Sequence, residues 1–465
     1  MSKQGIRSVV AMDHAHVWHP FTQMRDWLGS RPIVLVSGKG SVLRDANGKE
    51  YLDANSSIWT NLHGHRHPRL DMAVRRQLAK VAHVSALGFA NVPASRLASR
   101  LSREAGLPKV FFSDDGSTAM ETALKLAHEF TRRTRRARAR TRFVSMEGAY
   151  HGDTVGAVSL GHIDLFHRAY GGLLFPTDSV MSPYCYRCPF NRARPDAADA
   201  RSYRKCNWEC VGRFESVVTK ASRHGKAHAA FVYEPVVQGA AGMIMQPDGW
   251  LQRVADIARG HGLLLVADEV MTGFGRTGGD GLFAGNNQDV VPDLLAVAKG
   301  LSGGYLPLAA TLASQPIFDA FTGEYGEFKT FFHGHSYTAN PLGCAVALES
   351  MKLLSSKASI RQRDLLASWM QRDLPRLWRH DAVGDIRVEG TLGAVELVRN
   401  RATRQPFHLA ERVGARVCDA MARRGVLTRP VGNVVVLMPP YCTTAGQWGR
   451  IIEAIDDAME ELSPA

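Results

Sequence analysis

The sequence predicts a large α/β domain built on a mostly parallel sheet, followed by a smaller α+β domain. Three observations carry this prediction. Helical and strand-like patterns alternate from about residue 70 onward, the strand-like segments are short and continuously apolar, and no internal repeat interrupts them. Continuously apolar strands are typical of a parallel sheet covered by helices on both faces. Alternating strands and helices indicate right-handed crossovers within one domain.

Each element is predicted from its own pattern. Near the N-terminus, residues 32–54 read as two strands around the turn Asn47-Gly48. The later strands are predicted at 109–113, 142–146, 229–235, 263–269, 394–398 and 434–440, and the helices at 70–83, 117–133, 250–262 and 343–354. We therefore expect three parts: an N-terminal segment (1–68) that joins the small domain, a large domain (69–340), and a small C-terminal domain (341–465).

Composition restricts the class of protein. Hydrophobic residues make up 45% of the 465 residues and charged residues 22%, which is typical of a globular chain rather than a disordered one. No apolar run is long enough to span a membrane, so we expect no membrane association. The first twenty residues lack a signal-peptide core, and the seven cysteines are an odd number. A cytoplasmic, reducing location is expected.

A net charge of +13 could indicate a protein that binds nucleic acid. However, seven arginines are concentrated in residues 131–142. A helix end with solvated guanidinium groups accounts for such a run. No aromatic residue is interleaved with the run Arg132 to Arg142 to stack on bases. No nucleic-acid partner is therefore predicted, with an RNA-binding arm as the alternative.

Polar features follow three of the predicted strands, and ligands of open α/β sheets bind beyond such strand ends. After the first of these strands, Gly116, Ser117 and Thr118 begin a helix. The free N–H groups and the helix dipole at such a turn suit a phosphate. Thr118 and Glu121 fit a capping box, so an ordinary capped helix is the alternative.

Asp268 and Lys299 end two further apolar strands. A buried carboxylate needs a cationic or hydrogen-bonded partner, and burial gives a lysine the neutral amine that attacks a carbonyl. Taken singly, Asp268 could be a helix cap or an arginine partner, and Lys299 could reach water. Together with the phosphate-binding turn, they match what pyridoxal 5'-phosphate requires: a phosphate anchor, a carboxylate for the ring nitrogen and an aldimine lysine.

The longer sequence motifs of the chain resemble those of the class III aminotransferases, and the resemblance covers nearly the whole length. The carrying motifs are LVADEVMTGFGRTG at 265–278, Pro292-Asp293 and Lys299-Gly300, with Asp268 and Lys299 31 residues apart. The resemblance implies a pyridoxal-phosphate-dependent transferase of fold type I, the fold of aspartate aminotransferase. Its large domain would hold the mostly parallel sheet and its small domain would be α+β.

Within that class the chain is most similar to enzymes of biotin biosynthesis that convert 8-amino-7-oxononanoate to 7,8-diaminononanoate. The carrying segments are 16–24 (HVWHPFTQM), 56–59 (SSIW), 148–153 (GAYHGD), 238–240 (QGA), 333–337 (HGHSY) and 437–441 (LMPPY). The implied reaction is a ping-pong amino transfer through Lys299, with S-adenosylmethionine or lysine as amino donor. A class III aminotransferase for other ω-amino acids or diamines is the main alternative, and an aminomutase or racemase is a second.

The resemblance also assigns roles to single residues. Catalytic roles fall on Lys299, Asp268 and Tyr150. Cofactor-binding roles fall on Gly116, Ser117, Tyr150, Asp268, Val270, Lys299, His335 and Ser336. Substrate-binding roles fall on Phe21, Ile58, Trp59, Tyr150, Lys299, Gly334 and Arg429. His335 and Ser336 would reach the phosphate of the neighbouring subunit, which implies a homodimer with active sites at the interface.

For three of these residues the sequence without the resemblance favours another interpretation. Without the resemblance, Trp59 and Tyr150 would be interpreted as core residues and Arg429 as one half of a surface ion pair. The resemblance implies instead that the Arg429 guanidinium binds the substrate carboxylate. Two positions depart from the adenosylmethionine-using branch, because Phe21 stands for a tyrosine and Ile58 for a tryptophan. A branch that uses lysine has Phe and an aliphatic residue there, which leaves the donor open.

Four of the seven cysteines cluster in the sequence. Cys185 and Cys188 are followed, after 17 residues, by Cys206 and Cys210. This spacing approaches that of a four-thiolate zinc site, although the second pair is C-x3-C. Reduced thiols and disulfides are the alternatives, and no metal is predicted for the chemistry at Lys299.

Overall fold

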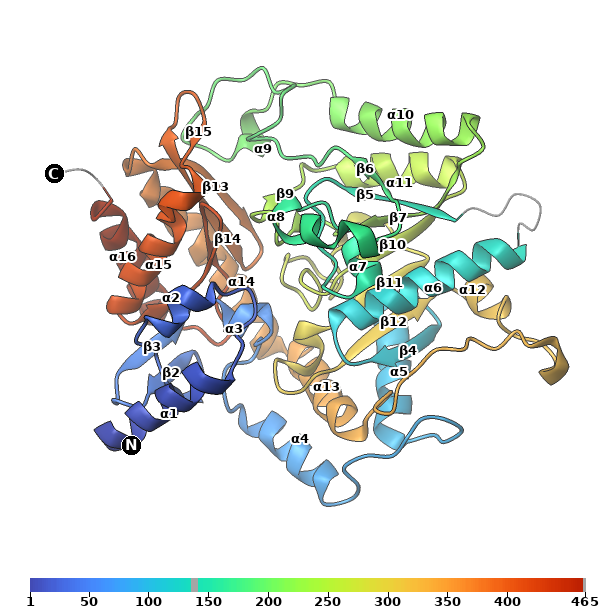
Figure 1. Cartoon of the computed structure of the whole chain (residues 1–465), viewed down its shortest axis with the longest axis horizontal. Helices are drawn as coiled ribbons and strands as arrows, with labels where there is room; N and C mark the ends of the chain where they lie inside the picture. The colour runs from blue at the N-terminus through green and yellow to red at the C-terminus, as the bar shows by residue number, and fades with distance from the viewer. Residues whose placement is uncertain (135–140, 463–465) are drawn as a thin grey trace.

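A seven-stranded sheet forms the centre of the computed structural model, which describes residues 1–134 and 141–462 (Figure 1). In spatial order its strands are β4 (Lys109–Ser113), β12 (Ala309–Ala313), β11 (Leu294–Val297), β10 (Leu264–Asp268), β7 (His228–Tyr233), β5 (Arg142–Met146) and β6 (Asp178–Val180). Neighbours from β11 to β6 are parallel, and β12 is antiparallel to both β4 and β11. The predicted mostly parallel sheet is confirmed.

Helices cover both faces of this sheet because its central strands present apolar side chains to each face in turn. In β10, Val266 packs in the buried cluster of α6 (Gly116–Thr134), whereas Leu265 packs in the cluster of α11 (Trp250–Gly260). Helix α10 (Glu209–Arg223) lies beside α11 on the second face (Figure 1). Burial on both faces explains why these strands are continuously apolar.

The N-terminal and C-terminal parts of the chain lie on the same side of the molecule and share a sheet (Figure 1). Its strands are β1 (Leu35–Lys39), β2 (Val42–Asp45), β3 (Glu50–Asp53) and β16 (Val426–Leu427), and β16 is parallel to β3. The predicted turn at Asn47-Gly48 joins β2 to β3, with Gly48 at a φ of +90°, and β1 is an additional strand. A further sheet contains β13 (Val383–Glu389), β14 (Leu392–Asn400), β18 (Val434–Leu437), β17 (Pro430–Val431) and β15 (Gln405–Pro406).

The remaining helices surround these sheets. They are α1 (Lys3–His16), α2 (Met24–Leu28), α3 (Ser56–Trp59), α4 (Pro68–Leu78), α5 (Val92–Ala105), α7 (Val155–Ser159), α8 (Asp164–His167), α9 (Ala200–Tyr203), α12 (Gln315–Asp319), α13 (Pro341–Leu354), α14 (Lys357–Asp373), α15 (Val413–Arg423) and α16 (Ala445–Glu460); a short pair, β8 (Val237–Gln238) and β9 (Ile244–Met245), completes the strands. Helix α13 packs against α4 and α5. The domain boundaries expected from the sequence stay a prediction. Within the described ranges, no helix has both the length and the apolar character that crossing a membrane requires.

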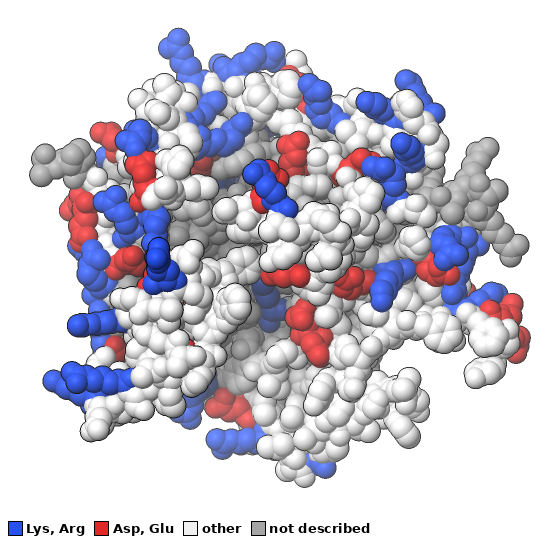
Figure 2. All heavy atoms as spheres, in the orientation of Figure 1, with Lys and Arg blue, Asp and Glu red and all other residues white. Residues whose placement is uncertain are grey.

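Charged side chains of both signs are interspersed on the face shown in Figure 2. In the arginine run, Arg133 pairs with Glu129 at 2.9 Å and Arg142 with Asp178 at 2.7 Å. Residues 135–140 of the run lie outside the described residues. The absence of a nucleic-acid partner therefore stays a prediction.

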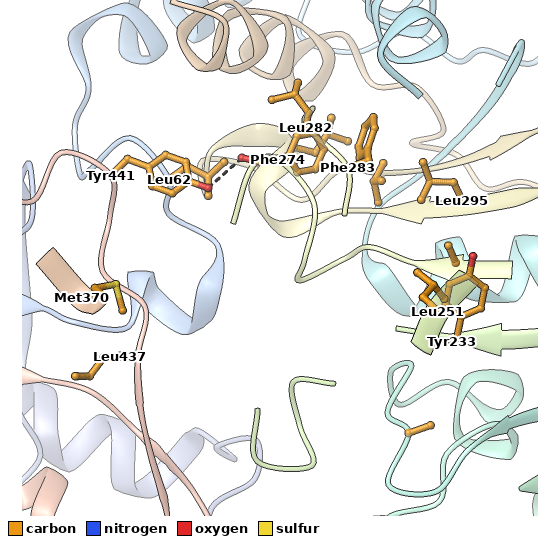
Figure 3. Close-up of a cluster of buried hydrophobic side chains, with 14 of the residues drawn as sticks. Leu62, Tyr233, Leu251, Phe274, Leu282, Phe283, Leu295, Met370, Leu437 and Tyr441 are labelled. Atoms are coloured by element: carbon orange, nitrogen blue, oxygen red, sulfur yellow. Dashed lines mark hydrogen bonds between the residues drawn. The ribbon is translucent and has the colours of Figure 1, made fainter. Parts of the chain in front are cut away.

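One hydrophobic cluster runs from the central sheet into the C-terminal part of the chain. Figure 3 shows buried side chains of this cluster, including Leu295 of β11 and Leu437 of β18. At its middle, the Tyr441 hydroxyl donates a hydrogen bond to the Phe274 carbonyl at 3.0 Å (Figure 3). Because this core is continuous, the central sheet and the C-terminal part are held in fixed positions relative to each other.

Residues Ser56 to Trp59 form a left-handed turn without a single glycine. Their φ angles are +47°, +47°, +63° and +70°, a conformation that costs an L-residue about 1–2 kcal/mol each. The carboxylate of Asp53 compensates by accepting hydrogen bonds from the N–H groups of Asn55 (3.1 Å) and Ser57 (3.0 Å). The buried Ser56 hydroxyl also donates to the Met438 carbonyl at 2.7 Å.

We predict that Asp53→Ala lowers the free energy of unfolding by about 2–4 kcal/mol, because several buried N–H groups lose their acceptor. Denaturant-induced unfolding measures this loss. The control is Asp26→Ala, which removes an exposed ion pair with Arg412 and should change stability by less than about 1 kcal/mol. Equal effects of the two variants would contradict the role given to Asp53.

Candidate active site

A cavity of about 450 Å³ lies beyond the ends of β4, β10 and β11. Of the residues predicted for the site, those that line it are Trp59, Gly116, Ser117, Tyr150, Asp268, Val270 and Lys299. The three strand-end features of the sequence therefore meet in one place, as ligand sites of open α/β sheets do.

Asp268 ends β10 and is 6% exposed. Its Oδ1 accepts a hydrogen bond from the Val270 N–H at 3.0 Å, and its Oδ2 lies 2.7 Å from Nδ1 of His151. Burial of the imidazole acts to lower the pKa of His151, but the hydrogen bond and charge of Asp268 outweigh it and the pKa is raised. The His151 ring supplies the partner that a buried carboxylate requires.

Lys299 follows β11, the parallel neighbour of β10, and begins the 3-10 helix η4 (Lys299–Ser302). Its φ of +37° is strained for a residue with a side chain. Burial lowers the pKa of its amine to about 8, against the opposing charges of Asp268 and Glu234. Its Nζ lies 4.6 Å from the centroid of the Trp59 ring. More of this amine is neutral near pH 7 than in an exposed lysine, which makes it a nucleophile.

The first turn of α6 forms part of the cavity wall, but its cap differs from the prediction. The Asp115 carboxylate accepts from the Thr118 N–H at 2.9 Å. Glu121, the other predicted member of the capping box, instead accepts from the Gly156 N–H at 2.7 Å. The capping box at Thr118 and Glu121 is therefore wrong, because an aspartate three residues earlier is a stronger N-cap acceptor than threonine.

Two glycines allow the segments of this wall to approach closely. A Cβ at Gly152, whose φ is +117°, would lie 1.8 Å from Oγ of Ser117. A Cβ at Gly116 would lie 2.8 Å from the Val270 side chain. The Ser117 hydroxyl accepts a hydrogen bond from the Asp153 N–H at 2.9 Å. The wall thus combines a helix N-terminus and a hydroxyl, two groups that suit an anion.

Tyr150 adds an aromatic wall. Its hydroxyl donates to Asp153 Oδ2 at 2.7 Å, and its ring is within 7° of parallel to His167. Burial, together with the hydrogen bond to Asp153, raises the pKa of the Tyr150 phenol well above its usual value, so the hydroxyl stays neutral. Phe21 lies edge-on to this ring, with 6.4 Å between the centroids.

The other predicted residues do not line this cavity within the described chain. Phe21 and Ile58 are exposed, the first against Tyr150 and the second on the left-handed turn beside Trp59. Arg429 is exposed and lies between β16 and β17. Their substrate-binding roles stay predictions.

Residues 333–337 form an exposed loop that approaches the cavity rim. His335 Nδ1 lies 3.5 Å from Oδ2 of Asp114, which lines the cavity. Gly334 and Ser336 are on the same loop and are not in the cavity wall. A phosphate contact across a subunit interface stays a prediction for His335 and Ser336.

Sequence analysis missed two residues of the cavity, His151 and Glu234. Glu234 directly follows β7 as Asp268 ends β10, so the same strand-end pattern would have found it. Its Oε2 accepts from the Gly239 N–H at 2.8 Å, and burial raises the pKa of its carboxyl to about 7. His151 carries no signal except its place directly after Tyr150.

Comparisons with known proteins agree with this geometry. The family Aminotransferase class-III matches residues 25–459, and the chain belongs to this family. It is 46% identical to adenosylmethionine-8-amino-7-oxononanoate aminotransferase of Geobacter sulfurreducens over 97% of both chains. It is 47% identical to the protein of that name from Nitratidesulfovibrio vulgaris, over 97% of this chain and 81% of the relative.

Solved structures give the same result for the fold. The adenosylmethionine-8-amino-7-oxononanoate aminotransferase of Methanocaldococcus jannaschii superimposes with a TM-score of 0.90, at 35% identity, covering 98% of this chain and 99% of that chain. An omega transaminase of Pseudomonas jessenii in complex with PMP superimposes with a TM-score of 0.89 at 26% identity, covering 97% and 98%. The protein is therefore an aminotransferase with the predicted fold type I.

We predict that Gly152→Ala weakens binding of pyridoxal 5'-phosphate at least about tenfold, or 1.4 kcal/mol, because the new methyl group displaces Ser117. Titration of cofactor-free protein measures the dissociation constant. Gly212→Ala on α10 is the control, because a Cβ there meets open space and should leave the constant unchanged. A wild-type constant in Gly152→Ala would show that Ser117 does not form the anion site.

Proposed function

We propose that the protein is a pyridoxal-phosphate-dependent enzyme that converts 8-amino-7-oxononanoate to 7,8-diaminononanoate in biotin biosynthesis. The observation that carries this proposal is the meeting of Asp268, Lys299 and the first turn of α6 in one cavity. The choice of substrate is supported by relatives of 46–47% identity that are named for this amino acceptor.

The shape and chemistry of the cavity fit pyridoxal 5'-phosphate. The first turn of α6, with Gly116 and Ser117 in the cavity wall, would bind the phosphate through its N–H groups and the Ser117 hydroxyl. Tyr150 and Val270 are the walls between which the ring would lie, and the Asp268 carboxylate would hold a proton on the ring nitrogen. Bound in this way, the cofactor supplies a reactive carbonyl carbon and an electron-accepting ring.

The residues of this chain supply the proton transfers and the positioning. The neutral Lys299 amine would remove the α-proton of the amino donor at Nζ and return it during the second half of the reaction. His151 fixes the Asp268 carboxylate through the 2.7 Å contact. Trp59, 4.6 Å from Nζ, shields the amine from water.

The substrate contacts proposed for the rim follow from charge and shape. Arg429 would bind the carboxylate of the nonanoate chain, since a guanidinium fork matches that anion. Phe21 and Ile58 would contact the amino donor, which is S-adenosylmethionine or lysine. Their lack of a hydroxyl and an indole favours lysine, because a pocket discriminates most strongly through polar partners.

We also propose a homodimer. The chain segment that leads to His335 and Ser336 and continues just past them exposes four aromatic side chains: Tyr325, Phe328, Phe332 and Tyr337. Exposed aromatic clusters of this kind are typical of protein interfaces. A second copy covering them would place His335 and Ser336 against the neighbouring cavity.

The decisive experiment is the pair of half-reactions. Holoenzyme is mixed in turn with S-adenosylmethionine, lysine and simple diamines, and the visible absorbance of the bound cofactor is followed. The true donor bleaches it, and subsequent addition of 8-amino-7-oxononanoate restores it. Lys299→Ala, which should remain folded, gives neither change. If the bleached enzyme does not recover with 8-amino-7-oxononanoate, the assignment of the acceptor is wrong.

A transaminase of other ω-amino acids or diamines is a second candidate, favoured by omega transaminases among the structural neighbours at 26–31% identity. In the same experiment this candidate predicts recovery with simple aldehydes or keto acids instead of 8-amino-7-oxononanoate. The two proposals therefore give opposite results with one preparation of enzyme.

We predict that cofactor-free protein condenses with pyridoxal 5'-phosphate at a rate that rises with pH and levels off above a midpoint near 8. The reason is that only the neutral Lys299 amine attacks, and its pKa is lowered to about 8. In Asp268→Asn the midpoint should move to lower pH, since the charge that raises this pKa is lost. Stopped-flow absorbance measures the rates. Asp114→Asn is the control and keeps the midpoint; a shift to higher pH in Asp268→Asn would refute the electrostatic account.

A further inference from the structure

Outside the active site, the four clustered cysteines line one small cavity. Cys185 and Cys188 are in the turns that follow β6, whereas Cys206 precedes α10 and Cys210 is in its first turn. The cavity has a volume of about 10 Å³, which is room for one water-sized body and none for an organic ligand. All four residues are free thiols in this structure.

The segment that carries these cysteines has little regular structure. Between β6 and α10 the only helix is the four-residue α9. Irregular segments of this length are uncommon inside compact domains and are usually functional. Hydrogen bonds from the Arg192 N–H to the Lys205 carbonyl and from the Lys205 N–H to Asn191 Oδ1, both 3.0 Å, join its two halves. These bonds bring the turn of Cys188 beside Cys206.

The surroundings of the cavity favour negatively charged sulfur. The Arg204 guanidinium donates to Sγ of Cys206 at 3.1 Å, and it stacks on the Trp208 ring with Cζ 3.9 Å from the centroid. Residues 183–210 contain six Lys or Arg against three Asp or Glu. Positive charge is therefore available to balance several thiolates.

We propose that Cys185, Cys188, Cys206 and Cys210 bind one zinc ion as a structural site with four thiolate ligands. The C-x2-C and C-x3-C pairs fall within the spacing of such sites, and one pair in a turn with the other at a helix start lets four sulfurs surround a point. Binding forms four Zn–S bonds and releases the four thiol protons to solvent.

The ligand cluster is not closed in this structure. Among the described residues, no three His, Cys, Asp or Glu side chains are grouped so that they hold a metal ion. The cysteine side chains must therefore turn toward the cavity centre as the ion binds. A small cavity already bordered by all four makes this a change of side-chain rotamers within one loop.

The site would fasten the cysteine segment to the C-terminal part of the chain. From this segment, Arg187 binds Glu396 of β14 at 2.7 Å and Arg201 binds Glu389 of β13 at 2.6 Å. An ion that orders the segment therefore stabilises the contact between the two parts of the molecule, and its role is independent of the chemistry proposed at Lys299.

The test is the metal content of holoenzyme after incubation with zinc and removal of the excess by gel filtration. We expect about one zinc per chain in the wild type, as a structural site of this kind binds one ion tightly. Cys206→Ser should retain less than about a tenth of that, since one of four ligands is lost. Cys442→Ser is the matched control, a half-buried cysteine outside the cluster, and should retain all of it.

Two measurements on the wild type keep the proposal open to refutation even where a variant does not fold. Cobalt(II) in place of zinc should give the visible bands of a tetrahedral thiolate complex, and a strong chelator should lower the melting temperature. Absence of bound zinc, equal zinc in Cys206→Ser and the wild type, or fewer than seven titratable thiols in the unfolded, metal-free chain would each overturn it. Loss of activity in the half-reactions with zinc binding intact would refute the proposed function alone.

Discussion

Two neighbouring parallel strands end in opposite charges inside one cavity, and the rest of the site depends on this pairing. Asp268 ends β10 and Lys299 follows β11, so hydrogen bonding between the strands fixes the distance between a carboxylate and an amine. Burial lowers the pKa of Lys299 while Asp268 and Glu234 act against it, and the result is about 8. Neither burial nor charge alone would leave the amine balanced near neutral pH.

The surrounding fold explains how such a balance is maintained. Charges that are separated from water interact strongly, and small displacements change their energies considerably. The continuous core that joins β11 to β18 prevents such displacements, because it links the sheet to the last part of the chain. A second buried cluster, which contains Met438, supports the wall that includes Trp59, since Trp59 packs against it and Ser56 hydrogen-bonds to the carbonyl of Met438.

The central sheet and its three strand-end features could be predicted from the sequence because both follow from burial. A strand covered on both faces must be apolar throughout, so a charged residue at its end, such as Asp268, is conspicuous. Glu234 obeys the same rule, since it directly follows the buried strand β7. The true cap at Asp115 was missed because local spacing cannot decide between two competing acceptors.

Other features have no local signal at all. The pairing of β16 with β3 joins residues 374 positions apart, such as Val426 and Leu52. The contact of His151 with Asp268 spans 117 positions. The rim residues Phe21, Ile58 and Arg429 were found through the resemblance to class III aminotransferases alone, and no element of the single chain fixes their roles. Long-range contacts of this kind follow from the assembled fold rather than from any window of sequence.

The left-handed turn separates the support of the cavity wall from its chemistry. The backbone of residues 56–59 is held by Asp53 and by the buried Ser56 hydroxyl. The Ile58 side chain is 43% exposed and plays no part in that scaffold. A single substitution at position 58 can therefore change the exposed side chain without altering the hydrogen bonds that hold the backbone turn.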